Sequence, residues 1–153
     1  MLCDDEIKVL HEALDDEYKA FATYDGVIED FGEVAPFTNI REAEGRHIAA
    51  LLNLYEKYDL PVPDNPWLGR VDHYDSIEAA CQAGVEAEIA NGAMYDRLIQ
   101  MTQRDEILNV LNNLQAASQQ RHLPAFQRCV ERGNAGGRHR RGGGRGRKRP
   151  EEY

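Results

Sequence analysis

The sequence predicts an all-α protein, a four-helix bundle followed by a low-complexity C-terminal tail. Apolar residues recur at helical spacing in four long segments, and turn-forming or proline-rich stretches separate these segments. A chain of 153 residues is long enough to bury a hydrophobic core within one domain. We therefore expect a bundle over residues 1–132 and a disordered tail over residues 133–153.

The first two helices are expected at about residues 4–31 and 36–58, joined by a short turn. Asp4 and Asp5 suit the positive end of the first helix, and Pro36 suits the first turn of the second. The apolar stripe of the first helix consists of Leu10, Ala13, Leu14, Phe21, Tyr24, Val27, Ile28 and Phe31.

Residues 59–75 contain three prolines and no helical period, so we expect a long crossover along the length of the bundle. Ser76 is a suitable N-cap for a third helix that ends near residue 102. The fourth helix is expected at about residues 104–132. Pro124 lies inside it and cannot donate a backbone hydrogen bond, which predicts a kink or a π-bulge.

Acidic and imidazole side chains interrupt the apolar stripes of all four helices. Glu17 and Glu88 lie on the inward stripes of the first and third helices, and His122 lies on that of the fourth. In the second helix, Glu44 and His47 are three residues apart and therefore share a face. A lone carboxylate in such a position costs several kcal/mol unless it is paired or binds a cation.

The chain also contains an internal repeat of one helical hairpin. The first and third helices superpose with an offset of 71, and the second and fourth with an offset of 75. The paired residues are Glu17 with Glu88, Tyr24 with Tyr95, Glu44 with Gln119, and His47 with His122. Pseudo-twofold packing of the two hairpins would bring the Glu and His side chains together in the bundle core.

These residues and their surroundings resemble the ferritin-like di-iron carboxylate superfamily, and most closely a ferritin-like family of unknown function. The similar stretches, within about residues 4–130, are Ala13 to Tyr18, Phe31-Gly32 with Pro36-Phe37, Ala43-Glu44-x-x-His47, and Ser118 with His122 to Phe126. The resemblance implies a ferritin-like bundle that holds two Fe ions, or Mn and Fe, and acts as an oxidase or peroxidase on Fe²⁺, O₂ or H₂O₂. The implied metal-binding residues are Glu17, Glu44, His47, Glu88, Gln119 and His122.

Helix four departs from the family pattern, which expects a carboxylate three residues before the last histidine. Gln119 stands at that place and either binds metal through its carbonyl oxygen or only lines the site. Alternatively, a π-bulge near Pro124 turns Ser118 inward. Tyr24 and Tyr95 are either core residues with a hydrogen-bonded hydroxyl or catalytic residues that support the ligands or relay radicals.

Two other functions stay open at this stage: iron storage or delivery without turnover of an organic substrate, and a structural or RNA-associated bundle with a hydrogen-bonded polar core. In the last case Glu17 and Glu88 would form buried ion pairs with Arg46 or Arg121.

Charge and cysteine content favour a cytoplasmic metal-binding protein. Residues 1–132 carry 11 basic and 25 acidic residues, whereas residues 133–153 carry seven basic and two acidic residues. The acidic body does not suit a nucleic-acid surface, so nucleic acid would bind only weakly, through residues 133–149. Cys3, Cys81 and Cys129 are expected to be reduced thiols. The sequence shows no signal peptide and no membrane span, and a homodimer is the expected assembly.

Overall fold

The structure, a computed structural model, describes the backbone of residues 1–138 and the side chains of residues 1–133. The first three helices are α1 (Asp4–Phe31), α2 (Phe37–Lys57) and α3 (Ile77–Ile99). A fourth, longer rod consists of α4 (Asp105–Ala117), the π-helix η1 (Ser118–His122) and α5 (Leu123–Arg138). The described residues contain no strand, and the expected all-α four-helix bundle is confirmed.

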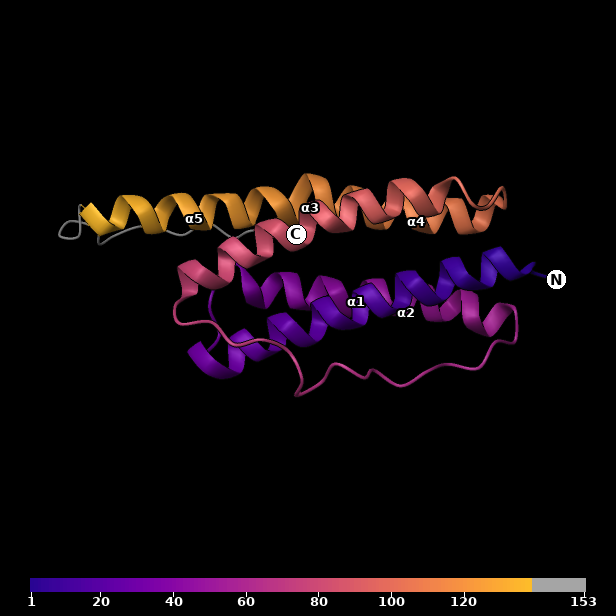
Figure 1. Ribbon diagram of the computed structural model, residues 1–153, viewed down its shortest axis with the longest axis horizontal. Helices are drawn as coiled ribbons and strands as arrows, with labels where there is room; N and C mark the ends of the chain where they lie inside the picture. The colour runs from indigo at the N-terminus through magenta and orange to yellow at the C-terminus, as the bar shows by residue number, and fades with distance from the viewer. Residues whose placement is uncertain (139–153) are drawn as a thin grey trace.

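The four rods pack as two hairpins, α1 with α2 and α3 with the rod formed by α4, η1 and α5 (Figure 1). The segment between α2 and α3 runs along the length of the bundle, so that α2 and α3 point in the same direction (Figure 1). This is the expected long crossover. Tyr18 fixes it to α1 by donating a hydrogen bond of 2.8 Å to the Pro63 carbonyl, and the Trp67 indole donates one of 3.0 Å to Asp15.

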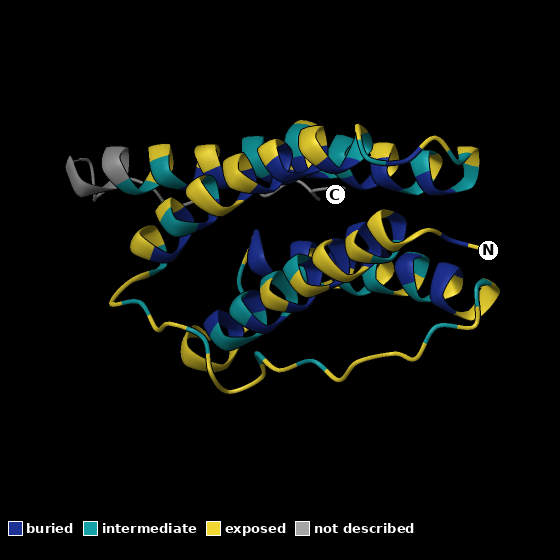
Figure 2. Cartoon of the chain, turned by 45° about the vertical axis from the view of Figure 1, so that its right-hand side comes forward, coloured by how far each residue is buried: buried dark blue, intermediate teal, exposed yellow. Residues whose placement is uncertain are grey.

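The faces that the helices turn toward one another are buried, as the dark blue sides of the ribbons show (Figure 2). Two apolar clusters fill the interior. One includes Leu14, Leu51 and Tyr95, and the other includes Tyr24, Phe37 and Phe126. On α1, Glu17 lies between residues of the two clusters, and the same holds for Glu44 on α2. The polar side chains therefore meet in the middle of the bundle, with an apolar cluster toward each end.

The fourth rod confirms the predicted π-bulge. The backbone N–H of Leu123 donates to the carbonyl oxygen of Ser118, five residues earlier, as in a π-helix. This wider turn precedes Pro124, which has no N–H to donate. The last helix also extends to Arg138, beyond the expected end of the bundle at residue 132. The rest of the predicted tail, residues 139–153, lies outside the described residues.

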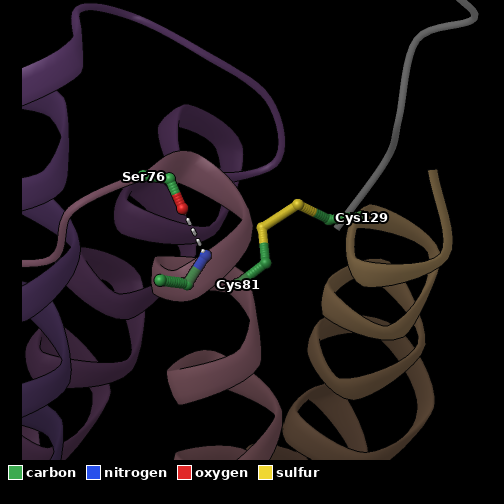
Figure 3. The surroundings of a disulfide bond; sticks show 4 residues. Ser76, Cys81 and Cys129 are labelled. Carbon is green, nitrogen blue, oxygen red and sulfur yellow. Dashed lines mark hydrogen bonds between the residues drawn. A yellow bond between two sulfur atoms is a disulfide. The ribbon is translucent and has the colours of Figure 1, made fainter. Parts of the chain in front are cut away.

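The expectation of three reduced thiols is wrong, because Cys81 and Cys129 form a disulfide between α3 and α5 (Figure 3). Only Cys3 is free, and it is exposed. Near Cys81, the Ser76 hydroxyl accepts a hydrogen bond of 3.0 Å from Ala79 N–H, which confirms the predicted N-cap of α3 (Figure 3). The cysteine argument for a cytoplasmic location therefore no longer holds. Within residues 1–138, every helix is too short or too polar to cross a membrane.

Candidate metal centre

Five of the predicted site residues lie together in the interior, although they come from four different rods. Glu17, Glu44, Glu88 and His122 are at most 3% exposed, and His47 is 9% exposed. They come from α1, α2, α3 and η1, and helical spacing places each of them on the inward face of its rod. The helices thus bring together residues that are up to 105 positions apart in the chain.

These side chains form two three-residue groups that share Glu44. One group consists of Glu17, Glu44 and His47, and the other of Glu44, Glu88 and His122. Within each group, one possible ligand atom of each residue lies within 4.8 Å of those of the other two. One carboxylate oxygen of Glu44 is 3.1 Å from His47 Nδ1, and the other is 3.4 Å from His122 Nδ1. The two imidazole rings stack with their centroids 5.4 Å apart. Glu44 therefore belongs to both groups and faces one imidazole with each of its carboxylate oxygens.

The tyrosine of each hairpin, Tyr24 or Tyr95, donates a hydrogen bond to the glutamate of the other hairpin. Tyr24 donates a hydrogen bond of 2.7 Å to Glu88 Oε2, and Tyr95 donates one of 2.5 Å to Glu17 Oε2. Burial and the nearby carboxylates raise the pKa of both phenols well above the ordinary value, so both remain donors. The tyrosines thereby hold one oxygen of each glutamate and fix its orientation.

Burial and mutual hydrogen bonding set the charges of the metal-free cluster. Burial alone would lower the pKa of His47 and of His122, but the carboxylates beside them (Glu17 and Glu44 for His47, Glu44 and Glu88 for His122) raise these pKa values to about 10 and about 9. Burial and the charge of Glu44 raise the pKa of Glu17 to about 7. Burial also raises the pKa of Glu44, but hydrogen bonds from Glu17 and both histidines outweigh it and lower the pKa. Protons on the imidazoles thus balance the carboxylates at neutral pH.

The chemistry of this donor set fits divalent transition metals. Carboxylate oxygens and imidazole nitrogens on facing helices are the ligands of di-iron and di-manganese bundles. His122 is fully buried; its Nδ1 lies 3.4 Å from Glu44 and 3.7 Å from Glu88, outside hydrogen-bonding geometry, and its Nε2 has no hydrogen-bond partner. A buried polar atom without a partner is costly, and a bound cation would satisfy one of these nitrogens.

Ser118 and Gln119 take different places at the π-helix. Ser118 is buried and donates a hydrogen bond of 2.6 Å to Glu88 Oε1. Gln119 Nε2 instead donates to the backbone carbonyl of Glu88, at 2.7 Å, and to Ser118 Oγ, at 2.8 Å. The Gln119 side chain lies so close to Gly92 that a Cβ there would be 2.5 Å from it, so a larger residue at this position would displace the Gln119 amide.

The alternative of buried ion pairs with arginine is not what these contacts show. Glu17 and Glu88 bond to tyrosine, histidine and serine side chains, whereas Arg46 and Arg121 are at exposed positions. Among the described residues, Glu17 and Glu88 therefore form no ion pair with Arg46 or Arg121.

A cavity of about 140 Å³ lies between α1 and α3, and Tyr24 and Glu88 form part of its wall. Asp16 and Asn91 line it as well and are joined by a hydrogen bond of 2.6 Å. The sequence patterns did not single out these two residues. Asp16 stands directly before a predicted ligand, which is the one signal that could have drawn attention to it.

Known structures with the same fold were found, although no family model and no curated protein matches the chain. A hypothetical protein from Methanococcus jannaschii is 24% identical with a TM-score of 0.77, over 88% of this chain and 84% of that one. An open-pore ferritin from Archaeoglobus fulgidus is 18% identical with a TM-score of 0.68, over 92% of both chains. A humanized archaeal ferritin is 16% identical with a TM-score of 0.71, over 92% of this chain and 90% of that one. The chain therefore has the ferritin-like four-helix fold.

Proposed function

We propose that this chain binds two iron ions, or one manganese and one iron ion, and acts as an oxidase or peroxidase on Fe²⁺, O₂ or H₂O₂. The observation that carries the proposal is the sharing of Glu44 by two groups of carboxylate and imidazole ligands. Glu17 and His47 would hold one ion, and Glu88 and His122 the other. When bound, such a metal pair supplies one-electron steps that none of these side chains supplies.

The protein's own residues would hold the reactants and exclude water. The apolar clusters on both sides of the centre limit access of solvent and of other reductants. The cavity beside Glu88 offers small reactants a route from the surface between α1 and α3. With Fe²⁺ as substrate, H₂O₂ takes one electron from each of two Fe²⁺ ions together with two protons, and leaves as two molecules of water.

Tyr24 and Tyr95 have a supporting part in this proposal. Their hydroxyls hold Glu88 and Glu17, and residues that orient metal ligands usually affect both metal affinity and reactivity. The phenols are also close enough to the centre to relay radicals, because each is hydrogen-bonded to a site glutamate. Phenylalanine removes both the hydrogen bond and the oxidisable phenol, so the two roles are separated by measuring metal affinity, which depends on the hydrogen bond alone, apart from turnover.

The test is an anaerobic titration with Fe²⁺, followed by exposure to H₂O₂. The native chain should bind two Fe²⁺ and consume one H₂O₂ for each pair of ions oxidised. Glu44→Gln should lose most of the binding, because it weakens both positions at once, and it should keep its helix content. Glu86→Gln, at an exposed position on α3, is the matched control and should bind as the native chain does. Equal binding by the native chain and Glu44→Gln would refute the proposal.

The likeness to archaeal ferritins supports storage or delivery of iron as a second candidate. A storage protein would retain many Fe³⁺ ions per chain after gel filtration and would require self-association beyond the expected homodimer. An oxidase or peroxidase would retain about two ions per chain and would continue to consume peroxide when Fe²⁺ is resupplied. Iron content and molar mass measured on the same fractions separate the two functions. A structural bundle would bind no metal at all.

A further inference from the structure

The two hairpins differ at one position of the centre, and the difference lies in the π-helix. The repeat offset between α1 and α3 is 71, as for Glu17 with Glu88. Two equivalent contacts outside the centre give the repeat offset between α2 and the fourth rod. Arg41 donates to Asp25 at 2.7 Å, and Gln115 donates to Asp96 at 2.8 Å. Asp25 and Asp96 are 71 apart, whereas Arg41 and Gln115 are 74 apart.

The offset between α2 and the fourth rod therefore changes from 74 before the π-helix to 75 after it. His47 and His122 keep the offset of 75, and both lie in the centre. At the offset of 74, the counterpart of Glu44 is Ser118, not Gln119. A π-turn contains about one residue more than an α-turn, so the four-residue step from Ser118 to His122 covers the same rotation as the three-residue step from Glu44 to His47.

The contacts of Ser118 agree with this equivalence. Its hydroxyl points into the centre and lies 2.6 Å from Glu88 Oε1. Gln119, in contrast, donates to the backbone carbonyl of Glu88 and to Ser118 Oγ, and its side chain packs over Gly92. The second hairpin thus has a short neutral side chain where the first hairpin has a carboxylate that reaches both positions.

We propose that Ser118 replaces the fourth carboxylate of this centre and thereby makes the second metal ion bind more weakly than the first. This inference rests on the proposed function. Three carboxylates and two neutral imidazoles carry a charge of −3. After the first divalent ion the centre retains only −1 for the second, whereas a fourth carboxylate would leave −2. Affinity for a divalent cation increases with the number of charged ligands.

The test compares stepwise binding of Co²⁺ by calorimetry in the native chain, Ser118→Glu, Ser118→Asp and Gln119→Glu. The native chain should bind two ions in separate steps. Ser118→Glu or Ser118→Asp should tighten the second step by about tenfold or more, because each restores a negative ligand. Both should also lower the melting temperature of the metal-free chain, because the new carboxylate lies beside Glu88. Gln119→Glu should leave the second step unchanged within about twofold.

Two results would overturn the inference: Gln119→Glu tightens the second step, or the native chain binds both ions with one affinity. If the Ser118 variants do not fold, the native chain and Gln119→Glu still decide between the two positions. If the native chain binds no Co²⁺ at all, the proposed function itself is refuted. This result comes from the native chain alone, so it is distinct from any result that concerns Ser118.

Discussion

Metal binding should release protons, because the metal-free cluster holds protons where the metal ions would bind. His47 and His122, with pKa values of about 10 and about 9, are both protonated at pH 7. Burial and the charge of Glu44 raise the pKa of Glu17 to about 7, so this carboxyl also holds a proton in part of the molecules. Imidazole and carboxylate bind metal only without these protons, so filling both positions at pH 7 should release about two protons per chain or more.

Calorimetry with Mn²⁺ in buffers of different ionisation enthalpy measures this number directly. At pH 8.5 Glu17 has already lost its proton before metal is added, and His122 has lost its proton in part of the molecules. The release should therefore fall below about two protons per chain. Release of less than one proton at pH 7, or a release that rises with pH, would refute the assignment of charges in the centre.

Four further results are expected. The melting temperature of the metal-free chain should fall between pH 7 and pH 10. The raised pKa values of His47 and His122 stabilise the folded chain fully below pH 6.5, and this stabilisation is lost as the pH rises through about 9 and 10. A melting temperature that rises over this range would contradict that sign. Tyr24→Phe should still bind two ions but lose roughly tenfold or more in metal affinity or peroxide turnover; unchanged values would exclude a role for the hydroxyl. Ala87→Leu, in the cavity wall, should slow Co²⁺ uptake in stopped-flow absorbance without changing its stoichiometry, whereas Ala93→Leu, exposed on the same helix, should not. Cys129→Ala should lower the free energy of unfolding in urea by about 4 kcal/mol, because the disulfide closes a separation of 48 residues, and Cys3→Ala should have little effect.

The helices and the burial of Glu17, Glu44, His47, Glu88 and His122 in one place could be predicted because each depends on local periodicity. Glu17 and Glu88 interrupt otherwise apolar stripes, and a stripe fixes which way a side chain points once its helix packs. The repeat then links the two hairpins, so that convergence of the ligands follows from packing two similar units. The expected first helix, residues 4–31, agrees with α1 at both ends for the same reason.

The register in the fourth rod could not be fixed from the sequence. Pro124 predicts a disturbed helix but not whether the chain responds with a kink or with an extra residue in one turn. A single offset of 75 therefore paired Glu44 with Gln119, and Ser118 was kept only as the alternative. The contacts of Asp25 and Asp96, which come from other rods, are needed to locate the change of offset.

The disulfide was missed because the cysteines are 48 residues apart and do not form a recognisable spacing. A signal was nevertheless present in the repeat. Cys81 corresponds to Leu10 and Cys129 to Leu54, and these two leucines belong to one buried cluster that both hairpins form. The repeat thus placed both cysteines on faces that point into the interior.

The most direct test of the account is an anomalous-scattering map of crystals soaked in Mn²⁺. Two strong peaks separated by about 4 Å, one on each side of the Glu44 carboxylate, are the expected result. One of them should lie against His47 and the other against His122. Manganese only on the acidic surface, with no peak between the four rods, would show that these side chains form a hydrogen-bonded core and not a metal centre.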